Sequence, residues 1–339
     1  MPDSSPLLVV EDLKTYFFTR RGIAKAVDGV SFTLNAGETL ALVGESGSGK
    51  SVTCLSLVRL VPEPAGKIVG GRILFEGDDL MQKSHAAMRR VRGKQIAMVL
   101  QDPMTSLNPA LTIGTQVSEV VRLHQKLRGA TLRARVVDAL GRLRISAPDT
   151  RLRQYAHQFS GGMRQRVSSA IALSCAPRLL IADEPTTSLD VTIQAQYLEL
   201  LKEVQAAAGV AVILVTHDFG IVAANADRVA VMYAGKIVEL GSTLQVFDHP
   251  SHPYTQALLR CLPDVGKKRH LVEIGGQPPD LARLPPGCPF APRCPERRPI
   301  CEEAFPPAVP VETGHVASCW AAQPVSVGSV GRSLPPTSI

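Results

Sequence analysis

Residues 44–51 have the sequence Gly44-Glu45-Ser46-Gly47-Ser48-Gly49-Lys50-Ser51, which matches the pattern G-x-x-x-x-G-K-[ST]. Glycines at this spacing let backbone N–H groups curl around phosphate oxygens, and the N-terminus of a following helix adds a favourable dipole. In such a loop Lys50 reaches the β- and γ-phosphates, and the Ser51 hydroxyl binds Mg²⁺. The apolar run 38–44 leads into the loop, which argues against a chance glycine turn. The stretch therefore predicts a nucleoside triphosphate site between a strand and a helix.

The chain from residue 7 to about 245 alternates apolar, strand-like runs with longer helical patterns, which predicts an α/β fold. Three runs are short and almost continuously apolar, as in central strands covered on both faces: 38–44, 179–183 and 210–216. Residues 229–240 predict two strands joined at Ala234-Gly235. Residues 115–178 predict helices, one of which begins after Ser160 and ends before Pro177.

Polar side chains stand at the ends of three expected strands. Asp183 and Glu184 end the run from 179, His217 follows the run 210–216, and Gln101 follows the run 96–100. Because the carboxyl ends of parallel strands meet at one edge of a sheet, we expect these side chains beside the phosphate loop. Asp183 would complete the magnesium shell, Glu184 would polarise the attacking water, and His217 would sense the γ-phosphate. Gln101 is placed for contacts with metal and water.

A second glycine motif opens the helix after Ser160, with the sequence Phe159-Ser160-Gly161-Gly162-Met163-Arg164-Gln165-Arg166. A small hydroxyl and two glycines at a helix N-terminus form a further anion-binding element. With this motif the chain resembles the ATP-binding subunits of ABC transporters, whose signature is L-S-G-G-Q. Phe159 and Met163 depart from that signature in the manner of its peptide-importer branch. Ser188-Leu189-Asp190 is similar to the D-loop of the same family, and together the matches cover about residues 8–245.

The resemblance implies an ATPase that works as a pair of subunits. In that family the P-loop of one subunit binds ATP against the signature motif of another, so Ser160, Gly161, Gly162 and the D-loop residue Asp190 would contact nucleotide. This chain has one motif of each kind, so a second ATPase subunit, expected to be a different chain, must complete the site. Phe17 stands where the family places its adenine-stacking aromatic, with Tyr16 as the competitor. Core packing is the alternative for these aromatic residues.

Charge is unevenly distributed along the 339 residues, whose formal net charge is +7. Between Val121 and Arg166 eleven Arg and Lys face two Asp. Such a stretch can be a solvated helical face, or it can lie on an anionic membrane surface or on nucleic acid. The stretch has few aromatic residues for stacking on bases, and the resemblance makes it the helical subdomain that grips membrane subunits. Membrane proximity is therefore favoured over nucleic acid.

Two features of the sequence bear on its location. The longest apolar run has ten residues, whereas a membrane-spanning helix needs about 20. The first residues carry Asp3 and lack the basic start of a secretory signal. We therefore expect a protein of the cytosol.

The sequence changes character near Pro250. Eleven of the 33 residues from 278 to 310 are proline, which predicts a loop-rich appendage that needs a stabilising element. Four cysteines with the spacing C-x5-C-x6-C-x17-C fall in or near it: Cys288, Cys294, Cys301 and Cys319. Disulfides are disfavoured in the cytosol, and the spacing fits neither the usual zinc pairs nor a ferredoxin pattern. Zinc, an iron–sulfur cluster and free thiols all stay open on the residues alone, with His315 a weaker candidate ligand than Cys319.

The segments 249–259 and 286–294 resemble the C-terminal extension of oligopeptide/dipeptide importer ATPases. Members of that family can carry a [4Fe-4S] cluster on such cysteines, and the resemblance thus favours a cluster over Zn²⁺. The expected organisation is an ABC ATPase domain at 1–248 with a helical subdomain at about 102–178. An extension at 249–322 and a disordered tail at 323–339 complete it.

The leading hypothesis is the ATP-hydrolysing subunit of a bacterial importer of di- or oligopeptides. Such a subunit lies peripherally on the cytoplasmic face of the inner membrane. It works with two transmembrane permease subunits, a second ATPase and an extracytoplasmic solute-binding protein, using ATP and Mg²⁺. The alternatives are an importer of glutathione, a nickel chelate or an opine, and a soluble ABC ATPase that acts on nucleic acid or ribosomes. An interaction protein with a degenerate ATP site is disfavoured because the P-loop lysine and both strand-end acids are present.

Overall fold

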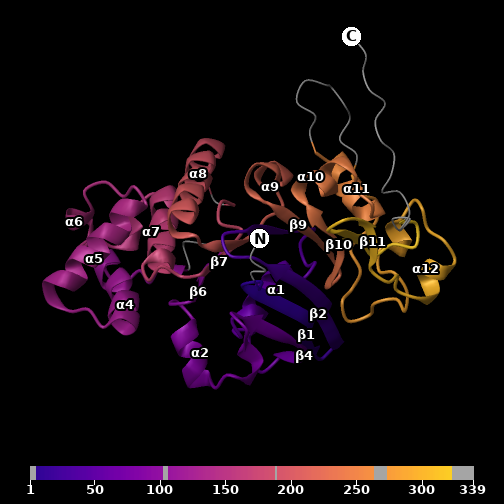
Figure 1. Ribbon diagram of the computed structural model, residues 1–339, viewed down its shortest axis with the longest axis horizontal. Helices are drawn as coiled ribbons and strands as arrows, with labels where there is room; N and C mark the ends of the chain where they lie inside the picture. The colour runs from indigo at the N-terminus through magenta and orange to yellow at the C-terminus, as the bar shows by residue number, and fades with distance from the viewer. Residues whose placement is uncertain (1–4, 102–105, 188, 263–272, 323–339) are drawn as a thin grey trace, which may run out of the picture.

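The computed structural model describes residues 5–101, 106–187, 189–262 and 273–322. The tail expected at 323–339, the first residues of the expected helical subdomain and Ser188 of the D-loop motif lie outside these ranges. The apolar runs of the sequence form the centre of an eight-stranded sheet with the order β11-β12-β10-β9-β3-β8-β7-β6 (Figure 1). Its strands are β3 (Thr39–Val43), β6 (Ile96–Val99), β7 (Leu179–Asp183), β8 (Ala211–Val215), β9 (Arg228–Tyr233), β10 (Lys236–Ser242), β11 (Val309–Glu312) and β12 (His315–Ala317).

The central strands are parallel, and the expected hairpin is antiparallel. Strand β3 pairs in parallel with β8 and β9, and β7 pairs in parallel with β6 and β8. Strand β10 returns beside β9 after the turn at Ala234-Gly235. The α/β architecture predicted from the sequence is therefore confirmed. The parallel strands all deliver their carboxyl ends to one edge, where the phosphate loop also lies.

A second, antiparallel sheet covers one face of the central sheet. It has the order β2-β1-β4-β5, with β1 (Leu8–Thr19), β2 (Gly22–Leu34), β4 (Gly66–Phe75) and β5 (Asp78–Asp79). Leu40 and Leu42 pack on this side with helix α1 (Lys50–Leu57), whereas Ala41 and Val43 pack on the opposite side with α9 (Phe219–Asn225). The alternation buries every residue of β3, and each such aliphatic side chain contributes about 1.5–3 kcal/mol. Strand β3 is thus a rigid base for the loop that follows it.

The helices expected at 115–178 form a lobe at one end of the molecule (Figure 1). They are α4 (Ile113–Gln125), α5 (Gly129–Arg142), α6 (Pro148–Arg151), the 3₁₀ turn η2 (Ala156–Gln158) and α7 (Gly161–Leu173). Val117, Leu140, Phe159 and Val167 are buried in a core of their own. Helix α8 (Val191–Ala208) joins this lobe to the central sheet. Two short elements, η1 (Leu80–Gln82) and α2 (His85–Val91), precede the lobe.

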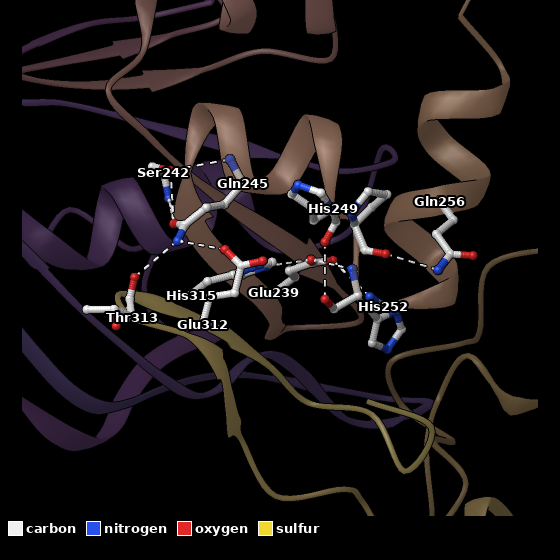
Figure 2. A network of polar contacts seen from close by, with 11 residues as sticks. Glu239, Ser242, Gln245, His249, His252, Gln256, Glu312, Thr313 and His315 are labelled. Carbon is white, nitrogen blue, oxygen red and sulfur yellow. Dashed lines mark hydrogen bonds and ion pairs between the residues drawn. The ribbon is translucent and has the colours of Figure 1, made fainter. Parts of the chain in front are cut away.

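The proline-rich extension lies at the opposite end and joins the central sheet. It follows α10 (Thr243–Asp248) and contains α11 (Pro253–Arg260), η3 (Ala291–Arg293) and α12 (Ile300–Glu303), together with β11 and β12. Strand β12 pairs antiparallel with β10 through Glu239↔Ala317 and Leu240↔Val316. Buried Glu239 accepts hydrogen bonds from the backbone N–H groups of Ser251 and His252 and lies 2.8 Å from Nε2 of His315 (Figure 2). The extension is therefore tied to the core of the fold by both strand pairing and buried hydrogen bonds.

Candidate nucleotide-binding site

The phosphate loop connects β3 to α1, as the sequence predicts. Gly49 caps α1 at φ 107°, and a Cβ atom there would lie 2.3 Å from the carbonyl oxygen of Ala26. Only glycine fits this position without moving the neighbouring strand. The buried Lys50 turns back into the loop, where its Nζ donates to the carbonyl oxygens of Gly44 at 2.7 Å and Glu45 at 3.0 Å. Burial lowers the pKa of Lys50, while the charges of Glu184 and Asp183 oppose that shift.

Asp183, at the end of β7, lies beside the start of α1. The Ser51 hydroxyl donates to Asp183 Oδ1 at 3.1 Å, so the structure brings together the two residues that the sequence assigns to magnesium. Burial raises the pKa of Asp183, and the hydrogen bond from Ser51 counteracts the shift. Hydroxyl and carboxylate oxygens are the ligands that Mg²⁺ prefers, and the donor set fits this ion.

Glu184 is the meeting point of the remaining polar residues. Its Oε2 accepts hydrogen bonds from Nε2 of Gln101 at 2.7 Å and from the Thr187 hydroxyl at 3.0 Å. Nδ1 of His217 lies 3.5 Å from Oε1. Glu184 has φ 45°, a left-handed conformation that costs about 1–3 kcal/mol and is concentrated at functional sites. The three strand ends therefore converge as the topology requires.

The second glycine motif is built separately, in the helical lobe. The Ser160 hydroxyl caps α7 by accepting from Met163 N–H, and Asp190 caps α8 by accepting from Ile193 N–H. A Cβ atom on Gly162 would lie 2.8 Å from Cγ2 of Ile193, so the two helix starts touch. A cavity of about 430 Å³ opens there, lined by Ser160, Gly161, Gly162 and Asp190 among others. The residues that line it include none of the P-loop, all of which the structure describes.

Two arginines of the basic stretch belong to this cavity. Arg144 and Arg166 line it, although the sequence pattern assigns them no role beyond the stretch's net charge. Other cations of the stretch are paired within the lobe, as in the contacts of Arg133 with Asp149 and Arg142 with Asp138. The charge excess is thus partly a set of surface ion pairs and partly a positive lining beside the second glycine motif.

The aromatic candidates on β1 point to different surroundings. Phe17 is half-buried, and its Cε1 lies 2.9 Å from the position a Cβ on Gly66 would take. The Tyr16 hydroxyl donates to Asp28 Oδ1 at 2.6 Å, and Lys25 Nζ lies 5.8 Å from the ring centre. Tyr16 already has a polar partner, whereas Phe17 presents only its ring. The geometry agrees with Phe17 as the first candidate for adenine.

The four cysteines of the extension come together in the fold. The pKa of Cys288 is raised to about 11, chiefly by burial and to a smaller extent by the neighbouring thiols of Cys301 and Cys319. Burial likewise raises the pKa of Cys294, which also senses Cys319 and Cys301. In the described ranges, no three His, Cys, Asp or Glu side chains are arranged to hold a metal ion, which supports neither the iron–sulfur cluster nor the Zn²⁺ alternative.

His315 is not a substitute for a cysteine ligand. Its Nε2 is engaged with Glu239 in the buried network of Figure 2, where both side chains are fully shielded from solvent. The sequence could not reveal this because Glu239 lies 76 positions away. Of the other cysteines, Cys54 is buried in the core as expected, and Cys175 and Cys261 are half-buried.

Two family models match the chain, one in the region of the phosphate loop and the central sheet and one further towards the C-terminus. Residues 27–187 match the model described as ABC transporter, and residues 238–301 match the model described as oligopeptide/dipeptide transporter, C-terminal region. The dipeptide transport ATP-binding protein DppD of Bacillus subtilis is 51% identical over 93% of this chain and 94% of its own length. This chain belongs to the ATP-binding subunits of oligopeptide and dipeptide ABC transporters. As a member of that family it is an ATPase, whose nucleotide is ATP with Mg²⁺.

Other relatives and solved structures agree with this assignment. The oligopeptide transport ATP-binding protein OppD of Bacillus subtilis is 49% identical over 94% of this ABC ATPase and 89% of its own chain. The structure of cbiO1 from Clostridium perfringens, part of the ABC transporter complex cbiONQ, matches with a TM-score of 0.62 and 30% identity. The match covers 73% of this chain and 92% of the cbiO1 chain. No helix in the described part of the ATPase is both long and apolar enough to cross a bilayer.

Proposed function

We propose that this ATPase subunit powers the import of di- and oligopeptides across the cytoplasmic membrane. The observation that carries the proposal is the combination of two parts in one fold. An ATP site assembled from Lys50, Asp183 and Glu184 shares its central sheet with an extension of the oligopeptide/dipeptide type. The names of the two relatives above describe transport of dipeptides and of oligopeptides, which supports the same class of solute here.

The roles of the site residues follow from their positions. Lys50 moves from the carbonyl oxygens of Gly44 and Glu45 to the β- and γ-phosphates, where its positive charge is compensated. Ser51 and Asp183 hold Mg²⁺, which neutralises phosphate charge when it is bound. Glu184 accepts a proton from the attacking water, and Gln101, whose Nε2 donates to Glu184 Oε2 at 2.7 Å, helps to orient that water. His217, whose side chain is 62% exposed, is free to contact the γ-phosphate.

A second ATPase subunit completes the nucleotide site. Because the P-loop is absent from the lining of the cavity at Ser160 and Asp190, each ATP needs residues from two chains. Arg166 adds positive charge to the surface that receives the partner's ATP, and Arg144, whose charge is paired with Glu203, lies beside it. We propose that the partner is a different chain, and that the pair binds two permease subunits on the cytoplasmic face of the membrane. An extracytoplasmic solute-binding protein then supplies the peptide.

The cysteine site is proposed to hold a [4Fe-4S] cluster with a structural or regulatory role. Four cysteines of the extension, three of which belong to or pack on one core, supply the thiolate donors that such a cluster requires. The chain's contribution is to shield the thiols and to fix the loop 288–301, where Cys288 N–H donates to Cys301 O at 2.7 Å.

The test of the transport function is gentle detergent extraction of membranes that contain a tagged copy, followed by identification of the co-purifying proteins. Two permeases and a second, similar ATPase are expected, and the purified complex should hydrolyse ATP faster when its receptor carries a di- or oligopeptide. Stimulation by glutathione, a nickel chelate or an opine but by no peptide would replace the solute. A copy found only with ribosomes or nucleic acid would contradict the transporter assignment.

Replacing Lys50 by Ala tests the ATP site itself. The variant should lose measurable ATP binding in calorimetry because the buried ammonium is the main positive charge of the loop. Lys202, on the outer end of α8, offers a control whose replacement by Ala should leave ATP affinity unchanged. Normal ATP affinity of the folded Lys50→Ala protein would refute the phosphate-binding role.

Replacing Cys294 by Ser tests the cluster. The variant is expected to lose bound iron and the brown absorbance while it still binds ATP, because the thiol lies in the extension and not in the P-loop. The matched control is Cys175→Ser, a half-buried cysteine of the helical lobe. Iron content is measured after anaerobic purification, and full retention of iron in the Cys294 variant would exclude this thiol as a ligand.

A further inference from the structure

Glu45, the second residue of the P-loop, is held by the C-terminal extension. Its backbone N–H donates to the hydroxyl of Tyr254 at 2.8 Å, and Tyr254 is a fully buried residue of α11. Its carboxylate forms a two-point ion pair with Arg293, with Nη1–Oε2 at 2.7 Å and Nη2–Oε1 at 2.9 Å. The carbonyl oxygen of the same residue accepts from Lys50 Nζ at 3.0 Å. One loop residue thus connects the catalytic lysine to two side chains of the extension.

The side chain of Arg293 is held in this contact by its other hydrogen-bond partners. Its side chain is 3% exposed, and its remaining donors reach Tyr233 Oη at 3.2 Å and the carbonyl oxygens of Gly275 and Ile274. The guanidinium also lies 5.9 Å from the ring centre of Phe290. A partly buried, bidentate pair of this kind is stronger and more directional than an exposed surface ion pair.

The aromatic residues around Arg293 connect the pair to the cysteine site. Phe290 packs at 5.3 Å, centre to centre, on both Tyr233 and Tyr254. It follows Cys288 by two positions, and Arg293 directly precedes Cys294. The short 3₁₀ helix η3 (Ala291–Arg293) lies between Cys288 and Cys294 in the sequence. The extension therefore supplies a packed, rigid support behind the start of the P-loop.

We propose that Arg293 is a positioning residue for ATP binding, which holds Glu45 in place and neutralises its carboxylate beside the phosphate site. The inference rests on the proposed ATP-binding role of the P-loop and adds to it a part of the chain outside the ATPase domain. Without Arg293, the carboxylate of Glu45 would be an uncompensated negative charge near the triphosphate and would repel it. The loop would also lose one of the two side chains by which the extension holds Glu45 before ATP arrives.

The experiment compares ATP affinity of full-length variants by calorimetry and the KM for ATP in the purified transporter complex. Arg293→Ala should raise the Kd and the KM about tenfold, the usual size of coupling between two sites, and leave kcat at saturating ATP nearly unchanged. Arg293→Lys, which keeps the charge but not the two-point geometry, should give an intermediate Kd. The control is Arg297→Ala, four residues along the chain, since Arg297 is 49% exposed and forms a surface ion pair with Glu302.

A second substitution separates positioning from general stability. Adding Glu45→Gln to Arg293→Ala removes the uncompensated charge, so the double variant should bind ATP more tightly than Arg293→Ala alone. If Arg293→Ala proves unstable, Tyr254→Phe, which keeps the ring and removes only the acceptor of Glu45 N–H, should raise the Kd severalfold.

Three results would overturn the inference. They are an unchanged Kd in folded Arg293→Ala, no recovery on adding Glu45→Gln, and a Kd change in the Arg297 control equal to that of Arg293→Ala. An unchanged Kd in Lys50→Ala would instead refute the ATP site itself and this inference with it. A loss of binding in Lys50→Ala beside a normal Kd in Arg293→Ala would leave the proposed function intact.

Discussion

The carboxylate of Glu184 accepts hydrogen bonds from residues of two loops, which fixes its orientation beside Asp183. The left-handed backbone conformation of Glu184 turns the chain out of the extended path that a strand would follow. Such strain is retained where the surrounding contacts over-determine it, and Glu184 N–H is bonded to Val215 O at 2.9 Å. A side chain held this way can accept a proton from water without first being reorganised.

Replacing Glu184 by Gln should therefore abolish hydrolysis and keep ATP binding. The amide preserves the shape and the contacts but cannot accept the proton, so we expect kcat to fall by roughly 10²–10⁴-fold. The measurement is phosphate release together with retention of radiolabelled ATP by the complex. Glu199→Gln, at an exposed position of α8, is the matched control and should hydrolyse ATP normally. Unchanged phosphate release in the Glu184 variant would assign the proton transfer elsewhere.

Residues that lie within one short motif could be predicted, and residues joined only by the fold could not. Lys50 and Ser51 are identified by eight consecutive letters, and Asp183 and Glu184 by the strand that they end. Arg293 is separated from Glu45 by 248 positions, and its neighbours give no sign of a distant carboxylate. Arg144 and Arg166 were visible only as members of a charge excess, because the cavity that they line forms when two helix starts meet.

At the scale of elements, the spacing of apolar residues predicted the central strands and the helices of the lobe. It did not predict the small hairpin β11–β12. Proline cannot donate a ladder hydrogen bond, which argued for loops throughout residues 278–310. Strand β11, which contains Pro310, lies at the edge of the sheet, where a missing N–H costs little. The pairing of β12 with β10 depends instead on contacts that are remote in the sequence, above all His315 with Glu239.

Helix α11 makes the stability of the extension dependent on pH. Its N-cap is His252, whose Nδ1 accepts from Tyr254 N–H at 3.0 Å. Burial lowers the pKa of His252 to about 4, and Glu239 only partly opposes the shift. Between pH 6.5 and about 4 the unfolded chain binds a proton that the folded chain does not bind. The free energy of unfolding should therefore fall as pH falls through this window.

The His252→Asn variant tests this linkage because asparagine also caps helices. We expect wild-type protein to lose roughly 3 kcal/mol between pH 7 and pH 4 from this histidine, and the variant to lack that part of the slope. Urea unfolding at several pH values measures it, with the exposed His249→Asn as control. Identical slopes for wild type and His252→Asn would show that His252 is not responsible.

At the scale of the whole molecule, the P-loop and the second glycine motif belong to different parts of the fold. The first rests on the central sheet, and the second lies in the helical lobe where α7 and α8 begin (Figure 1). In the proposed pair, each chain would therefore contribute one half of each ATP site, and both halves would face the same partner. This division could be expected from one motif of each kind in the sequence, whereas the shape of the half-site could not.

A Ser160→Arg variant should separate the two half-sites. A bulky cation at the start of α7 fills the 430 Å³ cavity, so the assembled transporter should lose most of its ATP hydrolysis. The isolated variant should still bind ATP at its own P-loop, which does not line that cavity. Titration of ATP and phosphate release are measured on the same preparations. Full hydrolysis by the assembled variant would contradict the two-chain site.

The hairpin at residues 309–317 is synthesised late, and the subunit cannot complete its central sheet before then. Strand β10 is made about 70 residues before its partner β12, and until then it is an open edge of the sheet with Glu239 unmatched. An open edge invites pairing with other nascent chains. The ribosome must therefore release nearly the whole chain before the sheet is closed, and messages truncated within the extension should yield insoluble protein although every ATP-binding motif has been translated.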